Sequence, residues 1–376
     1  IEEAHRACRW VVCIDPAIDR RVLESRESRI IGFTTGEGCY GELNVTVSAR
    51  SDILSDIKNM LTRRLSEKFT NWDRERLKKA ADFCVDEMSE YMDGSRILKA
   101  LNPYDYEIHN YLAYILTLQK LRLTKPDSDY ALRTLINLDS YQHWFSDDEK
   151  DNKRPDFILI EIPKSTDNLD KSKKLTLNIK IVECKMGFEE DTQIAKAKSQ
   201  LEKGLRTMSM SWDPNNSGVR HRYFLNQLYR AIIFSPLDLE SNSADYETIR
   251  NKIFGILSGD YEINWTGDIF AFWLDSDSDI HDEYELDSEL VAELSEKGIR
   301  IGTLNCHIFG QTFIQKMLVP PDERSANFIH NNIPNTEENI DLGFIDEDQD
   351  DEIAFSETEP IGDIHVTTAP TDEAAS

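Results

Sequence analysis

The chain has 376 residues, of which 40% are hydrophobic and 30% are charged, and it carries a formal net charge of −27. This length permits a full hydrophobic core with additional segments, and the composition is ordinary for a globular protein. No stretch approaches the roughly 18 to 20 uncharged apolar residues that a membrane helix needs, so we expect no membrane partner. The chain opens on Ile1 rather than Met, and we expect it to be a piece of a longer protein.

The negative charge is unevenly distributed, and it does not by itself exclude a nucleic-acid partner. Residues 321–376 hold sixteen acidic residues and one basic residue, so this segment alone carries −15. Its mixture of Asp, Glu, Asn, Pro, Ser and Thr, with few large apolar residues, predicts a disordered acidic tail or linker. The segment 164–206, in contrast, is rich in lysine.

The cysteines do not form a metal-binding or disulfide pattern. They lie far apart in the sequence, and none belongs to a Cys-x-x-Cys pair or to a spacing typical of zinc sites. Scattered thiols in apolar surroundings are typical of a reducing compartment, which predicts a cytoplasmic protein. The six positions are Cys8, Cys13, Cys39, Cys84, Cys184 and Cys306.

In chain order, the first expected element is a small β unit in residues 1–50, built from short β-branched runs between turns. A helical connector is expected in 51–100, with helices at 51–69 and 73–92. A third helix is expected at 103–121, with Asn102 as its N-cap and Pro103 at its first position. The remaining elements of an α/β domain spanning 101–320 are a strand at 133–139, two strands within 153–187, helices at 189–208 and 220–235, and strands at 268–275 and 299–309.

The two strands within 153–187 carry charged residues where buried strands usually carry apolar ones. Because side chains alternate along a strand, Glu183 and Lys185 share one face and Cys184 lies on the other. We expect the hydrophobic face to pack against helices and the charged pair to point the other way. A hairpin would bring Asp156 beside Glu183, where the two carboxylates repel each other unless a cation lies between them.

Magnesium suits such a pair of carboxylates. It takes oxygen ligands, keeps several waters, and usually binds one or two carboxylates together with substrate phosphate. A lysine two residues away can then stabilise the attacking water or the charge that develops at phosphorus. The alternative interpretation is a solvated Glu-x-Lys pair on a surface strand.

The letters RPD at 154–156 and VECK at 182–185, placed across a hairpin, resemble the PD-(D/E)xK nuclease superfamily. This superfamily includes Mrr-like, RecB-like and many restriction endonucleases. The resemblance implies a restriction-endonuclease-like mixed sheet flanked by helices. It also implies Asp156 and Glu183 as Mg²⁺ ligands, with Mn²⁺ as a substitute, the carbonyl of Cys184 as a further ligand, and Lys185 as the catalytic lysine.

Two more site residues follow from the same resemblance. Family members often have a glutamate on the helix before the core, and Glu107 is at the corresponding place; the alternative is an ordinary helix-surface glutamate. Many members have a glutamine on the helix after the lysine strand. Gln200 is the first choice for this position and Gln193 the second.

The resemblance implies a metal-dependent endonuclease that hydrolyses DNA, as part of a prokaryotic restriction or anti-phage defence system. The expected partners are DNA and further proteins or domains, such as a translocase ATPase. RNA hydrolysis would use the same metal chemistry, and no short motif separates the two substrates. The alternative function is a catalytically inactive nuclease-like module that serves assembly or DNA holding in a larger complex.

Other motif matches fail on their surroundings. GEGCYG at 36–41 matches a dinucleotide-binding fingerprint, but a strand-like segment follows where a helix is needed, so we expect a β turn. DSDSDIHDEYEL at 275–286 lacks the glycine and the glutamate of a calcium loop. We expect His143 and Trp144 to form a packed edge, with a site-lining role as the alternative, and Cys306 and His307 to point to opposite faces of a strand.

Overall fold

The structure is a computed structural model. It describes residues 3–14, 30–38, 41–49, 51–90, 94–124, 129–138, 141, 144–145, 154–233, 235, 237–241, 243–276 and 281–320. All of these lie within 1–330, which forms one compact unit, with 331–376 as the second. The expected acidic tail at 321–376 and His143 therefore lie outside the described residues. No helix in the described ranges is both long and apolar enough to cross a membrane.

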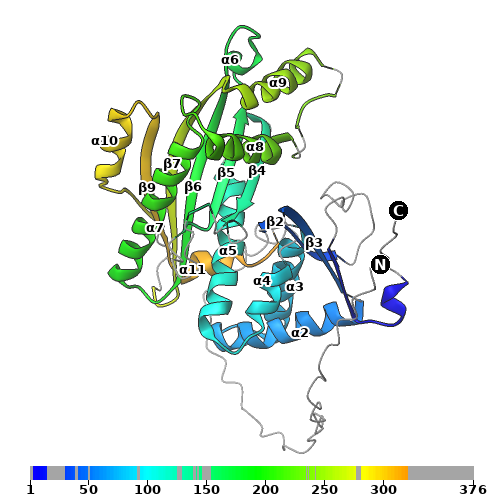
Figure 1. The fold of residues 1–376 in the computed structure, drawn as a ribbon. Helices are drawn as coiled ribbons and strands as arrows, with labels where there is room; N and C mark the ends of the chain where they lie inside the picture. The colour runs from blue at the N-terminus through cyan, green and yellow to red at the C-terminus, as the bar shows by residue number, and fades with distance from the viewer. Residues whose placement is uncertain are drawn as a thin grey trace, which may run out of the picture. The chain divides into compact units, whose positions relative to one another are not determined.

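A small antiparallel sheet is formed by the N-terminal part of the chain (Figure 1). After a short 3₁₀ turn, η1 (Ala4–Arg6), its strands are β1 (Trp10–Ile14), β2 (Ile30–Gly38) and β3 (Gly41–Ala49), in the order β1-β3-β2. This confirms the β-rich character expected for 1–50. The glycine-rich match at 36–41 falls on the β2–β3 hairpin, where Gly38 pairs with Gly41 and strand β3 follows in place of a helix; residues 39–40, where we expected the turn, lie outside the described residues.

Four helices follow: α2 (Ser51–Lys68), α3 (Arg74–Glu90), α4 (Gly94–Ala100) and α5 (Asp105–Thr124). The first two were predicted, and α4 was not. The prediction that Asn102 and Pro103 open the third helix is wrong. The amide of Asn102 donates to the carbonyl of Lys99, so Asn102 closes α4 with a tight turn, and α5 begins only at Asp105.

The central sheet has six strands in the order β4-β5-β6-β7-β9-β8. The β4–β5, β5–β6 and β8–β9 pairs are antiparallel, whereas the β6–β7 and β7–β9 pairs are parallel. The central sheet is thus a mixed sheet, and helices flank it, as predicted. The strands are β4 (Tyr130–Asn137), β5 (Phe157–Pro163), β6 (Leu175–Gly187), β7 (Tyr261–Trp273), β8 (His281–Glu285) and β9 (Ile301–Phe309). The remaining helices are α6 (Thr166–Leu169), α7 (Asp191–Ser211), α8 (Val219–Ile233), α9 (Ala244–Phe254), η4 (Gly255–Ser258), α10 (Glu289–Glu296) and α11 (Gln311–Met317).

Both faces of the six-stranded sheet are buried. Ile179 and Ile181 of β6 belong to a core that includes α7 and α8, whereas Val182 and Cys184 belong to a second core that includes α2, α3, α5 and α11. The expectation that the charged face of β6 points away from packed helices is therefore wrong. Glu183 continues the row of Ile179 and Ile181 beneath α7, and its exposed fraction is 0%.

Candidate functional site

The β5–β6 hairpin places Asp156 against β6. Phe157 pairs with Val182 in the antiparallel register, and Asp156 comes directly before Phe157, at the start of β5. The amide of Asp156 donates to the carbonyl of Val182 at 3.1 Å. Its carboxylate then continues the hydrogen-bond ladder, because Oδ2 accepts the amide N–H of Cys184 at 2.9 Å. The Asp156 carboxylate thus lies at the edge where β5 begins.

Helix α5 contributes a residue that the sequence did not indicate. The hydroxyl of Tyr114 donates to Oδ1 of Asp156 at 2.8 Å. The Arg96 guanidinium of α4 lies over the Tyr114 ring, 3.1 Å from its centroid, and also donates to Asn137 Oδ1 at 3.3 Å. Tyr114 and Arg96 are both buried. The Asp156 carboxylate is therefore fixed from two directions, by the backbone of β6 and by a side chain of α5.

Glu183 is a buried carboxylate with an incomplete set of partners. Its Oε1 accepts from the ammonium of Lys185, but its buried Oε2 has no hydrogen-bond partner among the described residues. Burial, and then the negative charge of Asp156, raises the pKa of Glu183 well above its usual range, against the opposing effect of Lys185. Glu183 is thus held at a cost in free energy, which is typical of functional carboxylates.

Lys185 connects β6 to α7. Its ammonium donates to Gln200 Oε1 at 3.0 Å, and Gln200 Nε2 donates to the carbonyl of Arg154 at 2.8 Å. Burial lowers the pKa of Lys185, but the charges of Glu183 and Asp156 outweigh burial and leave the pKa above its ordinary value. The side chain of Lys185 is 20% exposed, so the cluster reaches solvent through this lysine.

Of the two glutamines considered, the structure joins Gln200 to the lysine. Gln193 lies instead beside the end of β6, where its amide is 3.4 Å from the place a Cβ on Gly187 would occupy. Gln193 lies eight residues after Lys185 and Gln200 fifteen, and this spacing alone could not distinguish the two positions in the sequence.

The segment before Asp156 packs directly on α7. A Cβ added to Gly204 would lie 2.5 Å from Cγ of Pro155 and 3.1 Å from a methyl group of Ile181. Only a glycine lets the proline approach this closely. The Pro155–Gly204 contact therefore sets the distance between α7, which carries Gln200, and the chain that carries Asp156.

Cys184 contributes its backbone to the site and its thiol to the opposite face of the sheet. Its Sγ lies 3.2 Å from Asp156 Oδ2. Burial, and then the charge of Asp156, raises the pKa of the Cys184 thiol well above its usual range, so the thiol stays protonated. Because the N–H and C=O of one residue in an extended strand point to the same edge, the Cys184 carbonyl faces the edge where Asp156 lies.

Glu107 lies in the first turn of α5, seven residues before Tyr114, and is partly exposed. That separation is about 10 Å along the helix axis at a rise of about 1.5 Å per residue. Within the described part of the chain, no hydrogen bond or ion pair joins Glu107 to Asp156, Glu183 or Lys185. Its role in the site stays a prediction.

The basic residues of α7 are partly engaged by acidic neighbours. Lys198 donates to the carbonyl of Asp287, and Arg206 donates to Glu293 Oε2 at 2.7 Å. These contacts hold α10 against α7. They also leave fewer free cations on this helix for contacts with a phosphate backbone than its composition suggested.

Among the described residues, no group of three or more His, Cys, Asp or Glu side chains is arranged to hold a metal ion. A smaller set is present. Asp156 is close enough to Glu183 for its negative charge to raise the pKa of Glu183, and Glu183 Oε2 is an unused acceptor. Two carboxylates with waters suffice for magnesium, so these residues fit a hard divalent cation.

The remaining candidates are structural. Trp144 is 2% exposed and packs edge-on against Trp212 at a centroid distance of 5.9 Å, which confirms the packed edge. Cys306 belongs to the core beneath α7, whereas His307 stacks on Phe270, a residue of the other core. The two side chains therefore point to opposite faces of the sheet, as expected.

Comparison of the whole chain with known protein families, with curated proteins and with solved structures finds no match.

Proposed function

We propose that this chain is a metal-dependent nuclease, with Asp156, Glu183 and Lys185 as its reactive centre. The observation that carries the proposal is the convergence of these three side chains at the start of β5, two carboxylates and one lysine, with Glu183 buried and incompletely paired. A structural role alone gives no reason to keep a second carboxylate near the buried Glu183, because burial of charge costs free energy.

The fold is consistent with the proposal. A restriction-endonuclease-like fold implies a mixed sheet flanked by helices, and the central sheet is of this kind. The expected helix before the core and helix after the lysine strand are α5 and α7, and each contributes a side chain to the centre, Tyr114 and Gln200.

The metal ligands in this proposal are Asp156, Glu183 and the carbonyl of Cys184. When bound there, Mg²⁺ or Mn²⁺ would supply Lewis-acid polarisation of the scissile phosphate. Lys185 keeps its proton and can donate hydrogen bonds to an oxygen on which negative charge develops. Gln200 fixes the direction of the Lys185 ammonium, and Tyr114 and the Cys184 amide fix the Asp156 carboxylate.

DNA is the proposed substrate, and a restriction or anti-phage defence system, with a translocase ATPase or other protein partner, is the proposed context. These finer points rest on the resemblance of the RPD and VECK motifs to the PD-(D/E)xK superfamily rather than on any contact in the structure.

A second candidate is a nuclease-like module that has lost catalysis and serves assembly or DNA holding. One observation favours it: both oxygens of Asp156 already accept hydrogen bonds from the chain itself, and Glu183 is 0% exposed. A carboxylate has about four acceptor positions, so the three donors at Asp156 leave room for a cation but do not require one.

Metal titration separates the two candidates. Calorimetry with Mn²⁺ on the wild-type chain should show saturable binding that the Asp156→Asn and Glu183→Gln variants lose. The matched control is Asp167→Asn, which changes an exposed carboxylate of α6 and should leave binding unchanged. Equal binding by all four proteins would contradict the assigned ligands, and absence of binding by the wild type would favour the inactive module.

A further inference from the structure

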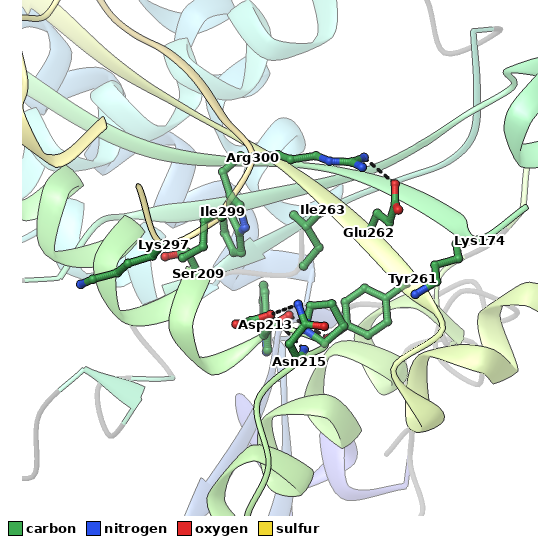
Figure 2. Close-up of a pocket in the computed structure, with 14 residues that line it drawn as sticks. Lys174, Ser209, Asp213, Asn215, Tyr261, Glu262, Ile263, Lys297, Ile299 and Arg300 are labelled. Atoms are coloured by element: carbon green, nitrogen blue, oxygen red, sulfur yellow. Dashed lines mark hydrogen bonds and ion pairs between the residues drawn. The ribbon is translucent and has the colours of Figure 1, made fainter. Parts of the chain in front are cut away.

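A polar pocket of about 230 Å³ lies on the α7 side of the sheet, at the end opposite to Glu183. It is formed where α7 ends, where β7 and β9 begin, and by the turn before β6 (Figure 2). Eight residues of β6 separate Leu175, next to this pocket, from Glu183, or about 26 Å at about 3.3 Å per residue. The pocket is thus distinct from the proposed reactive centre.

One wall of the pocket has a surplus of positive charge. Lys174 makes no hydrogen bond or ion pair within the described ranges, and Arg300 is paired through one nitrogen with Glu262. Figure 2 shows Arg300, Glu262 and Lys174 on the same side, while the ammonium of Lys297 is directed away from the pocket. Only Arg300 is paired with the carboxylate, so the ammonium of Lys174 and the remaining N–H groups of Arg300 are available to a ligand.

Several acceptors around the pocket already have donors. Asp213 Oδ1 accepts from both the amide and the side chain of Asn215, at 3.0 and 3.1 Å. The last carbonyls of α7 also have donors: His221 Nδ1 lies 3.1 Å from the carbonyl of Ser211, and the Tyr261 hydroxyl donates to the carbonyl of Trp212 at 2.7 Å. Asp213 Oδ1 and the carbonyls of Ser211 and Trp212 are therefore engaged within the chain.

The indole N–H of Trp212, a lining residue, is buried and has no partner among the described residues. Because that nitrogen has almost no accessible surface, the donors that a ligand in the pocket can reach are the ammonium of Lys174 and the guanidinium of Arg300. A complementary ligand must be rich in acceptors and negatively charged.

We propose that this pocket binds a small phosphorylated ligand of the size of a single nucleotide. A phosphate group supplies several acceptor oxygens and more than one negative charge, which matches two cations better than a single carboxylate does. The volume is below the roughly 300 Å³ at which pockets for drug-sized ligands begin, so a longer oligonucleotide would not fit inside it. The proposal does not depend on the nuclease assignment.

The test uses calorimetry and the fluorescence of the buried tryptophans, because Trp212 and Trp265 both line the pocket. The probes for the full chain are AMP, inorganic phosphate and adenosine, without divalent metal. AMP should bind saturably at millimolar or lower concentration, phosphate more weakly, and adenosine not at all. Each of Lys174→Ala and Arg300→Gln should weaken AMP binding by at least about tenfold, the range expected for a lost hydrogen bond to a charged group.

The matched control is Lys171→Ala, which removes an exposed lysine of the same turn that does not line the pocket. It should leave AMP affinity within about twofold, because a screened surface charge contributes little. Lys174 has no partner to lose, so its variant should keep the wild-type melting temperature. No saturable binding of AMP or phosphate, equal binding of adenosine, or equal effects of Lys174→Ala and Lys171→Ala would each overturn the proposal.

Discussion

Replacement of Gly204 by alanine tests whether the Pro155–α7 contact positions the site. In an open helix interior this change stabilises a protein by about 1 kcal/mol, because alanine has the higher helix propensity. Here the new Cβ would lie 2.5 and 3.0 Å from two ring atoms of Pro155 and 3.1 Å from Ile181. A proline ring is fixed to its own backbone, so the chain at 154–156 must move. Overpacking of this kind costs about 1–3 kcal/mol.

The net expectation for Gly204→Ala is a loss of up to about 2 kcal/mol in the free energy of unfolding, since the clash exceeds the gain in propensity. Urea denaturation followed by circular dichroism measures it. The control is Ser199→Ala, at an exposed position of the same helix, which should stabilise by up to about 0.5 kcal/mol. If Gly204→Ala is as stable as Ser199→Ala, Pro155 does not pack tightly on α7, and the described geometry of the Asp156 segment is refuted.

Three further variants test individual contacts. Tyr114→Phe removes the donor to Asp156 Oδ1 and should weaken Mn²⁺ binding at least about tenfold in calorimetry; unchanged affinity would argue against a positioning role. In EDTA, the raised pKa of Glu183 gives stability that is complete below its ordinary pKa of 4.5 and is lost as pH rises through the folded value. Glu183→Gln should therefore be more stable than wild type at high pH, by about 1–3 kcal/mol in urea denaturation, and this difference should shrink in acid. A difference in stability that does not depend on pH would contradict the raised pKa. Arg133→Met removes the guanidinium that pairs with Glu161, a carboxylate that is only 4% exposed, and should cost about 3–5 kcal/mol in thermal or urea unfolding. Adding Glu161→Leu to this variant should recover most of the lost stability. An Arg133→Met variant as stable as wild type would contradict the buried pair.

The hairpin that brings the start of β5 beside β6 was predictable because it depends only on local rules. Two apolar strands separated by a polar turn form a hairpin, and the period of two then fixes which residues share a face. The mixed sheet could be expected from the order of strands and helices. The start of α5 could not be placed correctly from the sequence. Asn102 fits the pattern of an N-cap, but its amide donates to the carbonyl of Lys99 and so closes the preceding helix, α4.

The contributions of distant elements were not predictable. Tyr114 lies 42 residues before Asp156 in the sequence, and nothing in its helix distinguishes it from the other buried tyrosine, Tyr111. The burial of Glu183 was missed because alternation shows that a charged face exists but not what covers it. That cover comes from α7, whose close approach depends on Gly204 and is visible only in three dimensions.

DNA cleavage by the wild-type chain and by two site variants tests the proposed nuclease most directly. Plasmid and single-stranded DNA are incubated with each protein in Mg²⁺, Mn²⁺ or EDTA, and the products are separated by electrophoresis. The variants are Asp156→Ala and Lys185→Ala, and the control is Lys196→Ala, an exposed lysine of α7. Metal-dependent cleavage that is lost in both site variants and kept in the control is the predicted result. Cleavage that survives in both site variants, or that continues in EDTA, would contradict the assignment.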